Sequence, residues 1–251
     1  MKSPMEIAQS YPETGRAKVS MPLGKTLLLA VLAGAFIALA GVGATFGNVY
    51  VNKVMGAAIF PAGLAMVIIA GSELFTGNCL LILPVLSGDI TAGKMLRNWL
   101  IVYLGNLIGA VLVAALTVWS GTFDNMYETV IGTAVTKAAL PFDTALLRGV
   151  LCNVLVCLAV WMAMAAKDVA GKIMGLFFPV FLFVLCGFEH CVANMFYLPT
   201  GLFAAEHYDV AAEGLTLGTM WLGNLIPVTI GNIIGGCAVG AGYWAIYMRK
   251  K

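Results

Sequence analysis

Long apolar stretches separated by short polar ones make up most of the chain. Six stretches are long enough to cross about 30 Å of hydrocarbon as α-helices. They are residues 26–47, 54–86, 97–119, 143–166, 172–205 and 216–247. The second and the fifth are longer than one crossing requires, and each contains a cluster of polar residues near its middle. The pattern therefore predicts six transmembrane helices, two of which are interrupted.

Both polar clusters follow the same design. The first reads Gly71-Ser-Glu-Leu-Phe-Thr-Gly-Asn78, and the second reads Gly187-Phe-Glu-His-Cys-Val-Ala-Asn194. In each cluster a glutamate, Glu73 or Glu189, precedes the asparagine by five residues. A charged side chain facing lipid is costly, so these groups must face protein or a water-filled cavity. Irregular backbone at membrane depth occurs in the same two settings, and we therefore take the two breaks as the candidate functional region.

Composition agrees with a membrane protein. Hydrophobic residues make up 61% of the chain, charged residues 10%, and the mean hydropathy is +0.95. These values are too apolar for a soluble domain. The net charge of +2 gives no reason to expect a nucleic-acid partner. We expect one transmembrane domain over residues 1–251, in which residues 1–25 form a cytoplasmic segment with a short surface helix at Pro4–Tyr11.

The distribution of basic residues predicts the orientation. With both ends inside the cell, 11 of the 14 Lys and Arg residues fall on the cytoplasmic side, against 3 of 14 for the opposite topology. Cytoplasmic loops carry the excess of positive charge in membrane proteins. The chain is therefore predicted to cross the cell membrane (inner or plasma membrane) several times, with both termini cytoplasmic. All six cysteines fall within the apolar stretches, so we expect packing residues rather than disulfides.

The two halves of the chain resemble each other. Residues 97–110 align with residues 223–236 without a gap, and the alignment matches Asn98 with Asn224 and Gly105-Asn106 with Gly231-Asn232. Three crossings in each half make the second half enter from the opposite side, so the repeat is predicted to be inverted. Repeat one covers about 26–120 and repeat two about 143–247. Inverted repeats with interrupted helices place a permeation site near the midplane; chance similarity between small-residue helices is the alternative.

Three motifs in this order resemble the formate/nitrite transporter family. They are Ala70-Gly-Ser-Glu-Leu-Phe-Thr-Gly77, Cys152-Asn-Val-Leu-Val-Cys-Leu-Ala-Val-Trp161 and Gly187-Phe-Glu-His-Cys-Val-Ala-Asn-Met-Phe196. The resemblance extends over all six stretches. It implies an all-α, aquaporin-like fold, a homopentamer in the lipid bilayer, and a pore in each protomer for small monovalent anions such as formate, nitrite, hydrosulfide or lactate.

The resemblance also implies roles for individual residues. His190 matches the central pore histidine, and Thr76 matches its partner on the opposite loop. Lys137 matches the lysine that draws anions into the outer vestibule. The narrow apolar rings correspond to Leu74, Phe75 and Phe183, with Phe60 as a further lining position, and Asn194 is assigned to the same pathway. One departure is Asn78-Cys79 after the threonine, where many members have small hydroxyl residues, so the choice of anion within the family stays open.

The chemistry of these residues suits a weak acid. A histidine can offer a hydrogen-bond donor or a proton and take it back, since it titrates near working pH. Apolar rings exclude water and disfavour the charged solute, so an acid that gains a proton between them crosses as a neutral molecule. Helix N-termini at the breaks add partial positive charge. We expect Glu73, Glu189 and Asn78 to structure the loops, with the carboxylates accepting backbone N–H groups rather than meeting the anion.

Other interpretations of the same residues stay open. His190 as a structural residue, the phenylalanines as ordinary core, and Lys137 as a solvated charge are each compatible with the sequence. A metal site at Cys186, His190 and Cys191 would need a fourth ligand, and haem would usually need a second intramembrane histidine. We therefore expect no metal, no cofactor and no enzymatic activity. The alternative classes are a neutral-solute channel, although no Asn-Pro-Ala repeat is present, and a membrane thiol enzyme.

Overall fold

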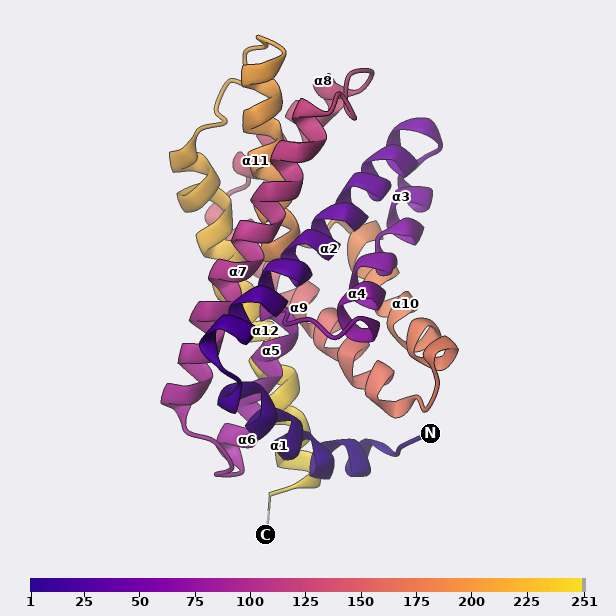
Figure 1. Ribbon diagram of the computed structural model, residues 1–251, viewed down its shortest axis with the longest axis vertical. Helices are drawn as coiled ribbons and strands as arrows, with labels where there is room; N and C mark the ends of the chain where they lie inside the picture. The colour runs from indigo at the N-terminus through magenta and orange to yellow at the C-terminus, as the bar shows by residue number, and fades with distance from the viewer. Residues whose placement is uncertain (250–251) are drawn as a thin grey trace.

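The computed structural model describes residues 1–249, and this part of the chain is helical without strands (Figure 1). The elements are α1 (Pro4–Ser20), α2 (Leu23–Tyr50), α3 (Lys53–Ile59), α4 (Pro61–Ile69), α5 (Phe75–Asn78), η1 (Cys79–Leu81), α6 (Ile82–Leu86), α7 (Ala92–Trp119), α8 (Tyr127–Ala138), α9 (Phe142–Ala165), α10 (Val169–Leu185), α11 (Cys191–His207), η2 (Thr219–Leu225) and α12 (Ile226–Tyr247). The predicted all-α class is confirmed.

Within residues 1–249, four helical segments are long and apolar enough to cross a membrane. They are α2, α7, α9 and the continuous segment Thr219–Tyr247. Shorter apolar helices cover Lys53–Ile69, Phe75–Leu86 and Val169–Leu185. The outward face of α7 exposes a leucine-rich stripe at a spacing of about one helical turn, at Leu100, Leu104, Ile108, Leu112 and Leu116. Large apolar side chains exposed in this way need an apolar surrounding, so the chain is a multi-pass membrane protein.

Both predicted interruptions are present. Helix α4 ends at Ile69 and the chain becomes helical again at Phe75, while α10 ends at Leu185 and α11 begins at Cys191. Each break starts with a glycine in the left-handed region, with φ of 77° at Gly71 and 71° at Gly187. Residues with a Cβ rarely adopt this conformation, so glycine allows the chain to leave the helix there.

Two tightly packed helix pairs, α2 with α7 and α9 with α12, hold the breaks in place. In the first pair a Cβ on Gly109 of α7 would collide with the carbonyl oxygen of Val31. In the second pair a Cβ on Gly235 of α12 would collide with the carbonyl oxygen of Val150. Missing side chains at these crossings let the backbones touch, which is how helices associate closely in lipid.

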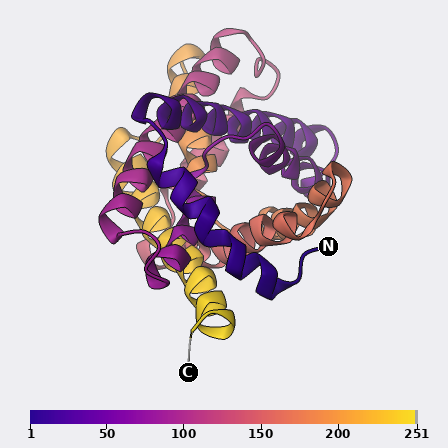
Figure 2. The ribbon, with the colours of Figure 1, turned by 60° about the horizontal axis from the view of Figure 1, so that its bottom comes forward.

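Helix α1 is longer than predicted and lies across one end of the bundle (Figure 2). It begins with a capping box between Ser3 and Glu6, and it continues to Ser20 rather than ending near Tyr11. Its inner side buries Ile7 and Tyr11. The N-terminus and the end of α12 lie at this same end of the molecule (Figure 1). The prediction was too short because it relied on a few apolar positions, whereas burial against the bundle stabilises the whole helix.

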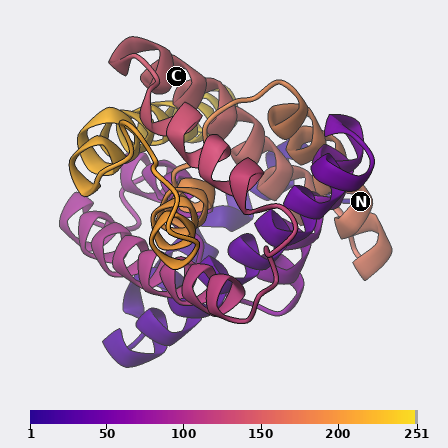
Figure 3. The ribbon, with the colours of Figure 1, turned by 90° about the horizontal axis from the view of Figure 1, so that it is seen from above.

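Helix α8 lies at the opposite end of the molecule (Figure 3). The sequence placed Lys137 in an outer loop and predicted no helix there. The first turn of α8 carries Glu128 and the last turn carries Lys137, so both charges interact favourably with the helix dipole. Its buried residues Val130, Ile131 and Ala134 recur at helical spacing, a signal that could have identified it.

Candidate functional site

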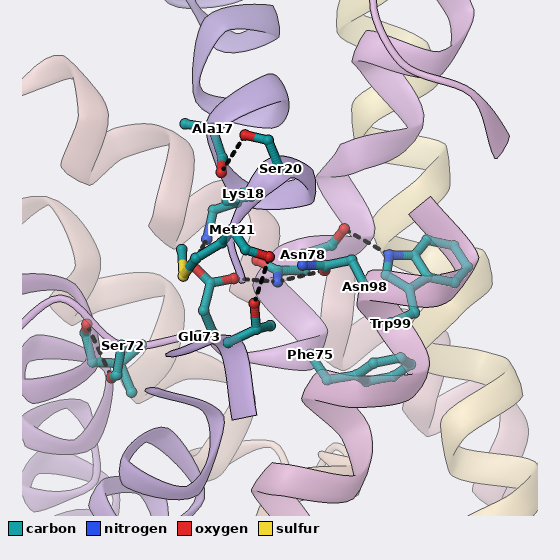
Figure 4. Close-up of polar contacts among 12 residues, drawn as sticks. Ala17, Lys18, Ser20, Met21, Ser72, Glu73, Phe75, Asn78, Asn98 and Trp99 are labelled. Atoms are coloured by element: carbon teal, nitrogen blue, oxygen red, sulfur yellow. Dashed lines mark hydrogen bonds and ion pairs between the residues drawn. The ribbon is translucent and has the colours of Figure 1, made fainter. Parts of the chain in front are cut away.

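The first break is held by an ion pair that the sequence did not predict (Figure 4). Glu73 Oε1 accepts a hydrogen bond from Lys18 Nζ of α1 at 2.7 Å. Glu73 Oε2 accepts from Asn78 Nδ2 at 2.7 Å, and the same amide donates to Asn98 Oδ1 of α7 at 3.0 Å. Trp99 Nε1 donates to the carbonyl of Asn78 at 2.8 Å. The buried carboxylate is thus paired with Lys18 and bonded to Asn78, which α7 holds in turn.

The second break has the same arrangement at the other end. Lys137 Nζ of α8 donates to Glu189 Oε1 at 2.9 Å and to Oε2 at 3.0 Å. Asn194 Nδ2 donates to Glu189 Oε2 at 2.6 Å and to Asn224 Oδ1 at 2.7 Å. Lys137 was expected as a charge that attracts anions, and its ammonium is in fact largely buried against a carboxylate. A paired lysine exerts a weaker field on a distant anion than a free one.

Asn106 of α7 holds the backbone of the first break. Its Oδ1 accepts the N–H of Phe75 at 2.9 Å. Its Nδ2 donates to the carbonyls of Ala30 at 2.7 Å and Glu73 at 2.9 Å. One neutral amide therefore satisfies three buried backbone groups, which a carboxylate cannot do because it only accepts.

Asn232 of α12 does the same for the second break. Its Oδ1 accepts the N–H of Cys191 at 2.9 Å, and its Nδ2 donates to the carbonyls of Gly149 at 2.8 Å and Glu189 at 2.9 Å. We expected the carboxylates of Glu73 and Glu189 to accept the loop N–H groups. That expectation was wrong, since lysine and asparagine side chains bind these carboxylates. The sequence alignment of Asn106 with Asn232 was the signal for this role.

His190 and Thr76 meet between the two breaks. Thr76 Oγ1 lies 2.8 Å from His190 Nε2, and the two residues are 0% and 3% exposed. His190 is also the N-cap of α11, where its Nδ1 accepts the N–H of Ala193 at 3.0 Å. Because Nδ1 uses its lone pair in this bond, the proton of the neutral ring lies on Nε2 and is donated to Thr76. The threonine hydroxyl then keeps its own hydrogen for a further acceptor.

Helix α9 fixes the backbone of Thr76 from behind. Asn153 Nδ2 donates to the Thr76 carbonyl at 3.2 Å and to the Asn232 carbonyl at 2.6 Å. Cys157 Sγ lies within donating distance of the same Thr76 carbonyl at 3.5 Å. Both residues belong to the second motif quoted above, although neither was predicted to have a role. Asn153 thus ties the first break to α12, whose Asn232 holds the second break.

Apolar side chains surround the histidine. The ring centroids of Phe60 and Phe183 are 5.8 Å apart and meet edge to face, and Phe183 lies parallel to the His190 ring at 5.9 Å. Phe75 turns toward α7 instead, with its ring against Trp99 at 6.2 Å and Tyr103 at 5.0 Å. Of the four predicted apolar lining residues, three thus gather near His190 with Leu74 among them, and Phe75 packs sideways.

Three cavities form a row through the molecule. The cavity beside α8, named outer after the predicted orientation, has a volume of about 160 Å³ and is bordered by Lys137, Glu189 and Asn194. The cavity beside α1, named inner in the same way, has a volume of about 560 Å³ and is bordered by Lys18, Glu73 and Asn78.

Between them lies a cavity of about 10 Å³ that shares residues with both neighbours. It shares Phe60, Phe183 and His190 with the outer cavity. It shares Leu64 and Leu74 with the inner cavity. Leu64 was not predicted, since nothing in the sequence separates it from other leucines of the apolar stretch.

The remaining interpretations concern metal ligands and thiols. Within residues 1–249, no group of three or more His, Cys, Asp or Glu side chains is arranged to hold a metal ion. All six cysteines are free, and Cys186 is exposed while Cys191 is buried. The three residues considered for a metal site, Cys186, His190 and Cys191, are therefore not among any such group in the described residues.

Comparison with known sequences gives matches over nearly the whole chain. A sequence model of the family described as Formate/nitrite transporter matches residues 5–245. A probable formate transporter from Methanothermobacter thermautotrophicus is 40% identical over 277 residues, covering 99% of this chain and 98% of that protein. The formate channel FocA of Escherichia coli (strain K12) is 38% identical over 271 residues, covering 99% and 95%.

Solved structures share the fold. An FNT family ion channel superposes with a TM-score of 0.84 at 33% identity, covering 96% of both chains. A pentameric formate channel with formate bound superposes with a TM-score of 0.78 at 34% identity, covering 90% of this chain and 98% of the other. The family match over residues 5–245 includes both breaks and the helices that hold them.

Proposed function

This chain belongs to the formate/nitrite transporter family, and from that premise we propose that it carries a small monovalent weak-acid anion, formate, across the membrane. The observation that carries the proposal is the row of three cavities, in which the smallest adjoins His190 and each larger one contains a lysine–glutamate pair. Relatives that are named channels and transporters support transport without catalysis.

The apolar constriction favours a neutral form of the solute. A cavity of about 10 Å³ holds roughly one water-sized group, so passage needs small movements of Phe60, Phe183 or Leu74. An ion in this place would lose most of its hydration without gaining a counter-charge. A weak acid avoids this cost by crossing in its protonated form, whereas chloride has no such form at working pH.

His190 and Thr76 supply the polar contact inside this apolar passage. Because Nε2–H donates to Thr76, the free hydrogen of the threonine hydroxyl is offered to a solute oxygen. A doubly protonated imidazole would direct a second N–H from Nδ1 at the N–H of Ala193 and break the helix cap. The geometry therefore favours His190 as a fixed hydrogen-bond donor over the proton exchange that the sequence suggested.

In this scheme Lys137 and Lys18 attract anions at the two ends of the pathway. Lys137 at the outer cavity and Lys18 at the inner cavity each provide a positive charge that a nearby glutamate moderates. A moderated charge concentrates anions without binding them too tightly to release. Asn194 borders the outer cavity and Asn78 the inner one, where each orients its glutamate.

We further propose six membrane crossings in an aquaporin-like, inverted 3+3 repeat, with α3–α6 and α10–α11 as the interrupted crossings. The matched contacts of Asn106 and Asn232 support it. So does the 3.1 Å contact between the hydroxyls of Tyr103 and Thr229, which are 126 residues apart. This is the offset of the sequence repeat, and equivalent residues of a two-fold repeat meet only near its axis.

Assembly and orientation follow from the same reasoning. A homopentamer with a pore in each protomer is proposed because one relative is described as a pentameric formate channel. Both termini are proposed to be cytoplasmic in the cell membrane, since that orientation puts 11 of the 14 basic residues inside, and α1, which carries Arg16 and Lys18, lies at the same end of the molecule as the end of α12 (Figure 1). Hydrosulfide and nitrite are the alternative anions of the family; a neutral-solute channel is the alternative from another class.

Uptake into vesicles tests the proposal. Purified protein in proteoliposomes should admit formate, nitrite and hydrosulfide in stopped-flow or radiolabel assays, with formate uptake faster at the lower of two pH values. The same vesicles should not swell rapidly in glycerol. Vesicles that admit glycerol and ignore formate would show a neutral-solute channel instead.

A further inference from the structure

Lys137 has a second neighbour besides Glu189. Its ammonium lies 5.5 Å from the centroid of the Tyr197 ring, on the ring face. This is within the range of a cation–π interaction, in which the negative face of an aromatic ring attracts a cation. The ammonium and the ring both border the outer cavity, so the contact belongs to the mouth of the pathway.

The Tyr197 ring has a defined position. It is packed against Phe196 with centroids 5.2 Å apart. Both rings lie against Gly41 of α2, where a Cβ would be 3.5 Å from Tyr197 Cζ and 2.8 Å from Phe196 Cδ1. The missing side chain at Gly41 makes room for this pair of rings. Tyr197 is thus held by packing and not by Lys137, so the ring can act as a fixed support.

The inner lysine has a different environment. Tyr197 follows Glu189 by eight residues, and the residue that follows Glu73 by eight is Leu81. Leu81 is fully buried and has no ring face to offer, and Lys18 is held by Glu73 at the wall of a larger cavity. Among the described residues, a lysine ammonium over an aromatic ring is found at the outer mouth and not at Lys18.

We infer that Tyr197 is a positioning residue, which holds the Lys137 ammonium at the base of the outer cavity and so sets how readily this mouth takes up the anion. The inference rests on the proposed transport of small anions. Lysine side chains have many rotamers, and Glu189 alone fixes the ammonium while cancelling much of its charge. The ring adds a restraint and leaves the charge in place, because a neutral aromatic face does not compensate it.

Formate uptake by three variants tests this role. In Tyr197→Leu the support is lost, so the half-saturating formate concentration should rise about two- to fivefold with a smaller change in maximal rate. Tyr197→Met has a longer, unbranched side chain that adapts to the vacated space and should give the same shift, which guards against a packing defect. Tyr197→Phe keeps the ring face and should behave like the unchanged protein.

Two controls separate positioning from general damage. Tyr127→Leu removes a different aromatic ring at the same end of the molecule, which stacks on Tyr208 with centroids 4.5 Å apart. This variant should leave the half-saturating formate concentration unchanged. In a Lys137→Ala background, Tyr197→Met should add no further effect, since the ring then has no cation to hold. Equal defects in Tyr197→Phe and Tyr197→Leu, or additive effects of Lys137→Ala and Tyr197→Met, would overturn the inference. A wild-type protein that moves no formate would instead refute the proposed function.

Discussion

Thr76 Oγ1 and His190 Nε2 lie 2.8 Å apart, and this contact joins the first break of the chain to the second across 114 residues. The bond is buried and lies next to the smallest cavity, with Phe183 beside the imidazole. In a low-dielectric setting a hydrogen bond is strong, and a partner left unpaired is costly. The Thr76–His190 hydrogen bond therefore lies beside the narrowest part of the row of cavities.

Replacing Thr76 tests the hydroxyl. Thr76→Val keeps the shape but leaves His190 Nε2–H without its acceptor and removes the donor offered to the solute, so we expect formate flux to fall about tenfold or more. Thr76→Ser keeps the hydroxyl and should retain most of the flux. Both are measured by stopped-flow uptake at equal protein content. Equal rates in Thr76→Val and wild type would mean that the solute does not contact this hydroxyl.

A double variant can separate the attraction of anions by Lys137 from its neutralisation of Glu189. Lys137→Ala leaves a buried carboxylate at the outer mouth, which repels the anion and destabilises the break, so low-concentration uptake should drop about tenfold. Adding Glu189→Gln removes the unpaired charge. If the lysine acts by attracting anions, the double variant stays slow and loses its salt dependence. Full recovery would mean that the lysine only neutralises Glu189.

The sequence predicted the breaks because polar residues stand out in apolar stretches, and the family resemblance matched His190 with Thr76. It did not predict the Lys18–Glu73 pair, since the last turn of α1 meets Glu73 only after the bundle has folded. Nor could it separate Leu64, which borders the constriction, from Phe75, which faces α7. Both are apolar residues in apolar stretches, and the rotation of each segment decides which side chain reaches the pathway.

The asparagines that hold the breaks should affect stability more than chemistry. Asn106→Leu leaves the backbone groups of Phe75, Ala30 and Glu73 without partners, and each such buried group costs about 1–3 kcal/mol. Asn232→Leu should be comparably destabilising, because the native Asn232 side chain makes the same three kinds of contact with backbone groups. Thermal unfolding in detergent measures both. A large loss in one variant and none in the other would argue against equivalent halves.

Truncating Phe183 should widen the constriction, whereas truncating Phe75 should leave it largely unchanged. Phe183→Ala opens the wall shared by the outer and smallest cavities, so discrimination between formate and larger monocarboxylates should weaken. Phe75→Ala removes a ring packed against Trp99 and Tyr103, so it should cost about 3–5 kcal/mol of stability with less change in selectivity. Competition assays with acetate and lactate give the selectivity. The opposite pattern would place Phe75 in the path.

The role of His190 can be decided with a variant that keeps its contacts but cannot titrate. Asparagine is among the best N-cap residues, so in His190→Asn its oxygen should accept the Ala193 N–H while its amide remains a donor near Thr76. If the histidine is a fixed donor, formate uptake should rise as pH falls in both proteins, because more of the acid is then protonated in solution. The His190→Asn profile should therefore parallel that of wild type at a lower rate.

His190→Phe loses both the helix cap and the hydrogen-bond donor and should be nearly inactive. Uptake is measured at fixed membrane potential between pH 5 and 8, where an unperturbed imidazole titrates. A flat profile in His190→Asn beside a steep one in wild type would show that the imidazole itself exchanges the proton.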